Sequence, residues 1–201
     1  MLDHVPVEYY ADYMEIEAYR HSPIRRRVIK AGLALALATL YPTVAQAHRP
    51  LGKRELKFFN LHTGDSLRAT YWQDGVYHRD ELEAINWILR DVRTGAAFPI
   101  ALDLLDLLYR LQSLLNTTCP FEVISGYRSA ATNAQLHARS TGVAKASLHM
   151  RGEAIDLRVS NRGLLQVRDA ARQLRSGGVG FYPRSQFVHL DIGRVRFWQG
   201  V

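Results

Sequence analysis

Two short segments near the end of the chain combine histidine and aspartate in a pattern that could hold a metal ion. The first, SLHMRGEAIDLRV (residues 147–159), places His149 seven residues before Asp156. The second, FVHLDIG (residues 187–193), contributes His189. Two imidazoles and one carboxylate form a common ligand set of catalytic zinc, which leaves one position open for water. Zinc lowers the pKa of that water to about 7 and so supplies hydroxide for attack on an amide.

The predicted strands would bring these ligands together. Asp156 alternates with apolar residues in EAIDLRV, and His189 and Asp191 do the same in FVHLDIG. In a strand such residues project from the face opposite the apolar one. If the two strands are neighbours, Asp156 and His189 meet above the sheet. His149 then returns from the preceding loop, where Gly152 permits a tight turn.

The residue types alone leave simpler interpretations open. A histidine or aspartate in a strand is usually a hydrogen-bonded polar group, and HLD could be a His–Asp pair on the surface. The chain has one cysteine, Cys119, which excludes an intramolecular disulfide and a cysteine-rich zinc framework. A bound metal must therefore be held by histidines and carboxylates.

The elements that must position these residues follow from turns and periodicity. A hairpin is predicted over residues 54–72, with its turn at residues 63–65. Asp80 is expected to cap a helix that ends near Gly95, and a leucine-rich helix opens at Pro99. Further strands and short helices are predicted from FEVISGYRS, AATNAQLHARS, EAIDLRV, residues 164–174, GVGFY, FVHLDIG and RVRFW. This order predicts an α+β fold with a mainly antiparallel sheet and helices packed on one face.

Residues 1–47 resemble an export signal. A basic cluster at residues 25–30 precedes an apolar run too short to span a bilayer, and AQA ends at Ala47. RRRVIK resembles the twin-arginine motif, although Ile24 stands where serine or threonine is usual. We expect cleavage before His48, a bacterial periplasmic location and no membrane span afterwards; an uncleaved amphipathic or anchoring helix is the alternative. Residues 48–201 are then a single domain, with a possible tether at its start.

The net positive charge indicates an anionic partner but does not identify it. The formal net charge of the 201 residues is +7, and all of it falls after residue 47, where 21 basic residues face 14 acidic ones. Such a surface favours nucleic acid, a membrane surface or an acidic cell-wall polymer. Export argues against nucleic acid. With 47% hydrophobic residues the exported part can build a core.

A family resemblance covers nearly all of this exported part. SLHMRGEAIDLRV is similar to the Ser-x-His-x-x-Gly-x-Ala-x-Asp motif of the LAS metallopeptidases (lysostaphin, D-Ala-D-Ala peptidase, hedgehog). VGFYPRSQFVHLDIGRVRFW and ISGYRSAATNAQL resemble further motifs of their murein-endopeptidase branch (MepK/YcbK-like), in which twin-arginine leaders are typical. The resemblance implies a hedgehog/D-Ala-D-Ala peptidase-like fold and one zinc ion bound by His149, Asp156 and His189.

The resemblance also implies roles for residues around the metal. Arg128, in SGYRS, matches the family arginine near the scissile group, where a guanidinium can bind an oxyanion or a peptide carboxylate; a structural salt bridge is the alternative. Ser147 could orient the loop or bind a substrate carbonyl. Many relatives carry Glu or His shortly before the last zinc ligand, but residues 185–188 contain no such group. Asp191 is the nearest candidate for the general base or for an orienting partner of His189.

These features together predict an exported zinc endopeptidase that cuts peptide cross-links of peptidoglycan. The resemblance favours cross-links between two diaminopimelate residues. We expect peptidoglycan peptide stems as partners and a monomeric protein. The missing Glu or His before His189 supports an alternative, a non-catalytic zinc-stabilised module that binds the cell wall.

Overall fold

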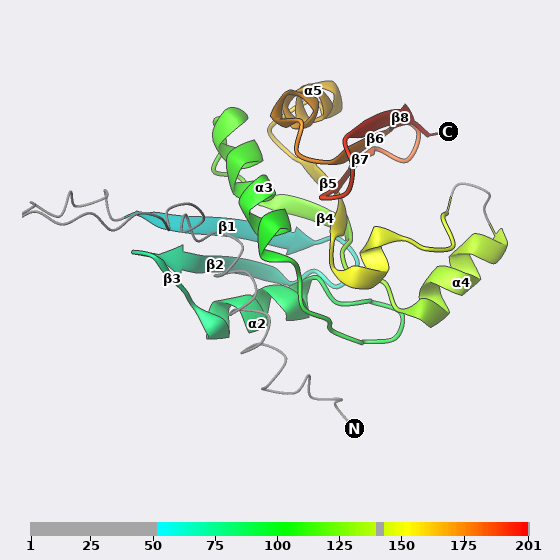
Figure 1. Cartoon of the computed structure of the whole chain (residues 1–201), viewed down its shortest axis with the longest axis horizontal. Coiled ribbons are helices and arrows are strands. Elements are labelled where there is room, and N and C mark those ends of the chain that lie inside the picture. The colour runs from blue at the N-terminus through cyan, green and yellow to red at the C-terminus, as the bar shows by residue number, and fades with distance from the viewer. Residues whose placement is uncertain (1–51, 140–142, 201) are drawn as a thin grey trace, which may run out of the picture. The chain divides into compact units, whose positions relative to one another are not determined.

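The computed structural model describes residues 52–139 and 143–200, which form one compact unit (Figure 1). The strands are β1 (Lys53–Asn60), β2 (Ser66–Gln73), β3 (Val76–Tyr77), β4 (Phe121–Ser125), β5 (Ala154–Val159), β6 (Gly178–Tyr182), β7 (Phe187–Asp191) and β8 (Arg196–Gln199). The helices are α2 (Arg79–Ile88), α3 (Leu102–Leu114), α4 (Ala130–Arg139), α5 (Leu164–Leu174) and the short 3-10 helix η1 (Leu148–Arg151).

The strands of this unit form one sheet in the order β3-β2-β1-β4-β5-β7-β6-β8. Five neighbouring pairs are antiparallel, whereas β1–β4 and β6–β8 are parallel. A parallel pair needs a long connection, which β2, β3, α2 and α3 provide between β1 and β4. The predicted α+β class is confirmed, and the sheet is mixed.

The predicted hairpin is present as β1 and β2. Leu56, Phe58 and Asn60 of β1 are buried, as their alternation predicted. Gly64 adopts a φ of 76° in the turn, a left-handed conformation that glycine reaches without strain. Asn60 also donates from its side chain to the Ile88 carbonyl at 2.9 Å, which ties the hairpin to the end of α2.

The leucine-rich helix is α3, and its start differs from the prediction. It begins at Leu102 rather than Pro99 because the preceding residues bond elsewhere. The Ile100 amide donates to Asn86 Oδ1 at 2.8 Å, and the Ala101 amide donates to the Gly152 carbonyl at 3.0 Å. The helix buries the predicted leucine stripe, which comprises Leu102, Leu105, Leu108, Leu111 and, just beyond its end, Leu115.

The first helix also starts differently. Asp80 was expected to cap it, but α2 begins at Arg79, with His78 at the cap position and Asp80 inside the first turn. An acidic side chain there still interacts favourably with the helix dipole.

The side chains of strand β5 alternate between the hydrophobic core and the polar face of the sheet. Ile155 and Leu157 are fully buried on the side where α5 packs against β5, β6 and β7. Helix α5 in turn contacts α3 (Figure 1). The alternate residues of β5, Ala154 and Asp156, therefore face away from these helices.

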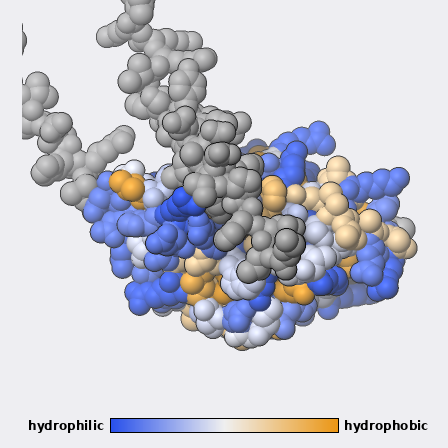
Figure 2. All heavy atoms as spheres, turned by 90° about the horizontal axis from the view of Figure 1, so that it is seen from below, coloured by the Kyte–Doolittle hydropathy of each residue, from blue (hydrophilic) through white to orange (hydrophobic). Residues whose placement is uncertain are grey.

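The surface of the described residues is mostly hydrophilic on the face shown in Figure 2, and hydrophobic residues form small separate areas there. No helix within residues 52–139 and 143–200 is both long and apolar enough to cross a membrane. The predicted signal, the twin-arginine motif and the cleavage point before His48 lie outside the described residues.

Candidate metal centre

The two predicted ligand strands are neighbours. β5 pairs antiparallel with β7, and Asp156 lies directly opposite His189. Residues paired in this way project from the same face of the sheet. Asp156 Oδ1 is 2.8 Å from His189 Nδ1. The prediction that these two side chains meet above the sheet is therefore confirmed.

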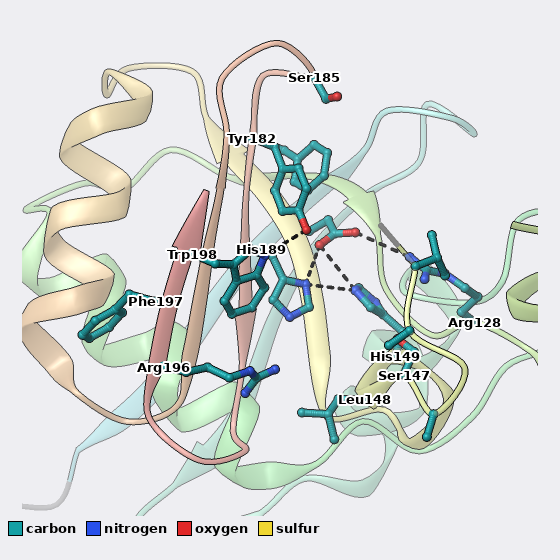
Figure 3. Close-up of a pocket in the computed structure, with 15 residues that line it drawn as sticks. Arg128, Ser147, Leu148, His149, Tyr182, Ser185, His189, Arg196, Phe197 and Trp198 are labelled. Carbon is teal, nitrogen blue, oxygen red and sulfur yellow. Dashed lines mark hydrogen bonds and ion pairs between the residues drawn. The ribbon is translucent and has the colours of Figure 1, made fainter. Parts of the chain in front are cut away.

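His149 reaches the same point from the loop before β5 (Figure 3). Its Nε2 atom lies 3.2 Å from His189 Nδ1 and 3.3 Å from Asp156 Oδ1. The loop turns at Gly152, whose φ is 66°. A Cβ atom at Gly152 would lie 2.2 Å from the Pro99 carbonyl oxygen, so the close packing as well as the turn requires glycine.

The outer hydrogen bonds of the two histidines orient their other ring nitrogens inward. His149 Nδ1 contacts the Gly126 carbonyl at 2.7 Å and must donate to it, because a carbonyl oxygen only accepts, and Nε2 is then the inner atom. His189 Nε2 lies 3.0 Å from Asp191 Oδ2 and donates there, which leaves Nδ1 as the inner atom. These two nitrogen atoms and one carboxylate oxygen of Asp156 lie within 4.8 Å of one another.

The chemistry of this group fits a divalent cation. Three lone-pair-bearing atoms at such short separations repel one another unless a proton or a cation lies between them. Burial lowers the pKa of His189, but hydrogen bonds to Asp156 and Asp191 outweigh it and raise that pKa to about 9. Burial raises the pKa of Asp156, yet the two histidines hold it well below its usual range. Two nitrogen donors and one oxygen donor suit zinc.

Asp191 is fully buried, and both of its carboxylate oxygens are engaged. Oδ1 accepts from the amides of Gly178 and Gly193 at 3.0 and 2.9 Å. Arg196 donates to both oxygens, at 3.0 Å to Oδ1 and 2.6 Å to Oδ2. Burial raises the pKa of Asp191, but His189, Arg196 and the amides hold it far below its usual range. Asp191 therefore stays ionised and faces His189 rather than the cavity.

Arg128 lies near the carboxylate oxygen of Asp156 that the two histidines do not contact. Its guanidinium lies 3.6 Å from Asp156 Oδ2 and donates to Ser125 and Asn133 at 3.3 and 3.4 Å. Its loop is fixed by Asp91, which accepts from the amide and the hydroxyl of the next residue, Ser129, at 2.9 and 2.6 Å. Arg128 thus forms the salt bridge that the sequence left open, and it also lines the cavity.

A cavity of about 640 Å³ opens above the three ligands. Its lining residues are Arg128, Val143, Ala144, Ala146, Ser147, Leu148, His149, Asp156, Tyr182, Ser185, Phe187, His189, Arg196, Phe197 and Trp198. Ser147 lies in this wall beside His149, as a substrate-binding residue must. Two other titratable residues in the neighbouring segments do not line the cavity. His137 contacts the Val143 carbonyl, and Glu153 forms an ion pair with Arg151.

Sequence reasoning missed the aromatic wall of this cavity. Gly178, Gly180 and Tyr182 alternate along β6, and Gly180 pairs with His189, so they share the face of the candidate metal ligands. A Cβ atom at Gly180 would lie 2.6 Å from the Trp198 ring. This missing side chain lets Trp198 cross β6 to within 5.3 Å of the His189 ring, measured between ring centroids. The glycines in GGVGFY were the available signal.

Comparison with known proteins agrees with this geometry. A family model described as "Peptidoglycan L,D-endopeptidase MepK" matches residues 48–198. The Escherichia coli K12 protein of that name is 44% identical over 175 residues, which cover 87% of this chain and 96% of the relative. A "Probable peptidoglycan L,D-endopeptidase MepK" from Haemophilus influenzae is 37% identical over 178 residues, covering 88% and 96%. The resemblance inferred from the sequence motifs is confirmed, and the chain belongs to the MepK family of murein endopeptidases.

Proposed function

We propose that the protein is a zinc-dependent endopeptidase that hydrolyses peptide cross-links of peptidoglycan after export. The observation that carries this proposal is the convergence of His149 Nε2, Asp156 and His189 Nδ1 at the floor of an open cavity. These three residues would hold one zinc ion. Zinc would polarise the scissile carbonyl and lower the pKa of a bound water.

Three residues around the metal site have roles in positioning and in substrate binding. Arg128 orients Asp156 and offers N–H groups to a carbonyl or carboxylate of the substrate. Ser147 binds a substrate carbonyl at the cavity wall. Asp191 fixes the ring orientation of His189 and is a positioning residue rather than the general base, because its oxygens are already hydrogen-bonded and buried.

We further propose that the scissile bond joins two diaminopimelate residues. The curated relatives carry the name peptidoglycan L,D-endopeptidase, and an amide between two diaminopimelate residues joins an L-centre to a D-centre. A link of this kind places free carboxylates beside the scissile amide. The two guanidinium groups of the cavity wall, those of Arg128 and Arg196, provide a cationic setting for these carboxylates.

Location and assembly form the rest of the proposal. Residues 1–47 act as a twin-arginine-type leader, and residues 48–201 act in the periplasm as a monomeric domain with a hedgehog/D-Ala-D-Ala peptidase-like fold. Support comes from the arginine cluster, the short apolar run and AQA at residues 45–47. Peptidoglycan lies outside the cytoplasmic membrane, which agrees with export.

One observation favours a second candidate, a zinc-stabilised wall-binding module without catalysis. Among the described residues that line the cavity, the carboxylates and imidazoles are those of the metal ligands alone. A dedicated general base is thus absent from that wall. Cleavage and binding assays separate the two candidates.

We expect the purified protein to cleave muropeptide dimers joined through two diaminopimelate residues, and a chelator to stop this cleavage. Added zinc should restore the rate, because the ligand cluster re-forms around the ion. Separation of products by chromatography measures the reaction, and dimers joined through D-alanine serve as the comparison substrate. Zinc-loaded protein that binds these dimers without cleaving them would instead establish the wall-binding module.

Zinc affinity should fall as the pH falls. In the metal-free site, His189 has its pKa raised to about 9 and so is protonated at neutral pH. Zinc must displace that proton, so below pH 9 the apparent affinity should fall about tenfold per pH unit for one proton released. Calorimetric titrations in buffers of different ionisation enthalpy measure the released protons. An affinity independent of pH between 6 and 8 would contradict this assignment of His189 as a ligand.

A further inference from the structure

The wall formed by β6 and β8 carries a hydroxyl group of defined orientation. Trp198 Nε1 donates a hydrogen bond to the Tyr182 hydroxyl oxygen at 3.0 Å. An indole N–H can only donate, so the hydroxyl oxygen is the acceptor and its own hydrogen must point elsewhere. Tyr182 and Trp198 both line the cavity above the metal ligands. The free donor direction of Tyr182 is therefore available to a bound substrate.

The position of Tyr182 follows from the register of the sheet. Gly180 lies opposite His189, and Tyr182 is two residues further along the same face of β6. Figure 3 shows the Tyr182 ring directed toward the ligand cluster, with its hydroxyl next to the Trp198 indole nitrogen. The ring is held by stacking on Phe187, with centroids 4.4 Å apart and planes 17° apart. At Gly200, a Cβ atom would lie 2.0 Å from the Tyr182 ring, so the chain end also packs against it.

The two guanidinium groups of the cavity wall also have protein partners. The terminal nitrogens of Arg196 bind Asp191. Those of Arg128 bind Ser125 and Asn133, and Nη2 also lies 3.6 Å from Asp156. The Tyr182 hydroxyl is held from behind by Trp198 and keeps its own hydrogen for a substrate atom. Donors fixed in this way are the ones that stabilise charge developing on a carbonyl oxygen.

We propose that Tyr182 is a catalytic residue, which donates a hydrogen bond to the carbonyl oxygen of the scissile amide as that oxygen gains negative charge. Trp198 is its positioning residue. In the reaction water adds to the carbonyl carbon, the C–N bond breaks, and the amine leaves with a proton from water. The Tyr182 hydroxyl keeps its proton throughout. This inference rests on the proposed peptidase function.

The test compares Tyr182→Phe with wild type in the zinc-loaded protein. Phenylalanine retains the stacking on Phe187 and removes only the donor, so kcat should fall about 100- to 1000-fold while KM changes little. A muropeptide analogue with a tetrahedral phosphinate at the scissile position should bind less tightly by a similar factor. Zinc content should equal that of wild type. Trp198→Phe should show a smaller loss of kcat, because Tyr182 remains but is less well held.

Tyr109→Phe, on α3 and away from the cavity, is the matched control and should behave as wild type. A Tyr182→Phe protein with wild-type kcat would overturn the inference alone. The inference would also be overturned if kcat/KM fell only because KM rose or because less zinc was bound, while the phosphinate analogue bound as tightly as to wild type. A wild-type protein that cleaves no dimer would overturn the peptidase proposal and this inference together.

Discussion

Asp156→Ala should abolish both zinc binding and cleavage of cross-linked muropeptides. The substitution removes the oxygen ligand that lies 2.8 Å from His189 and 3.3 Å from His149. A catalytic metal supplies several kcal/mol of transition-state stabilisation, so we expect kcat/KM to fall by at least about 1000-fold. Metal content by mass spectrometry and product formation by chromatography measure the two losses.

The same substitution also changes the charge of the site. Without its carboxylate, the half-buried Arg128 and the protonated His189 face one another with no Asp156 anion between them. Like charges at these distances repel, so the thermal stability of the metal-free variant should fall as well. Asp169→Ala, on the exposed side of α5, removes the same charge far from the metal and is the control. One zinc per chain with a wild-type rate in Asp156→Ala would refute the proposed metal centre.

Asp191→Asn should weaken zinc binding and lower the stability of the fold. Loss of the group that orients a metal-binding histidine typically costs 10- to 100-fold in metal affinity. The Asp191 carboxylate is fully buried and bound by Arg196, so the free energy of unfolding should fall by about 3 kcal/mol, the low end of the range for a broken buried ion pair, because Arg196 is partly exposed. Zinc titration and chemical denaturation measure these two effects.

This variant also distinguishes orientation from proton transfer. If Asp191 only positions His189, saturating zinc restores kcat to near the wild-type value. If Asp191 is the general base, kcat stays low when the site is full. Glu122→Gln, which breaks an equally short ion pair with Arg158 on β4 and β5, is a suitable control for the loss of one salt bridge.

The pH dependence of stability should report the same carboxylate. The pKa of Asp191 is held below its usual range in the folded state. Its contribution to stability is therefore complete above about pH 4 and is lost as the pH falls below that value. Asp191→Asn should lack this part of the acid transition.

Local patterns were sufficient to predict the ligand strands. The alternation in EAIDLRV and FVHLDIG assigned Asp156 and His189 to polar faces, and Gly152 indicated the turn that returns His149. These predictions succeeded because the period of a strand is a property of consecutive residues. The hairpin of β1 and β2 succeeded for the same reason.

Predictions that depend on distant partners were less accurate. The start of α3 moved from Pro99 to Leu102 because Asn86 and Gly152 bind the intervening amides, and neither partner is close in sequence. The mixed character of the sheet depends on where β4 and β8 return to it. A local sequence pattern does not indicate which other strand a given strand will pair with.

The sequence by itself determined the chemical inventory of this protein: the two histidines and the aspartate, their strand faces, and the family to which the motifs belong. Only the tertiary structure decided what surrounds them. The order β7-β6-β8 carries Trp198 across Gly180 to His189 and presents Tyr182 to the cavity. It also joins Arg196 to Asp191, which occupies that carboxylate with a protein partner. Periodicity is encoded residue by residue, whereas strand order is set by packing between segments far apart in the chain.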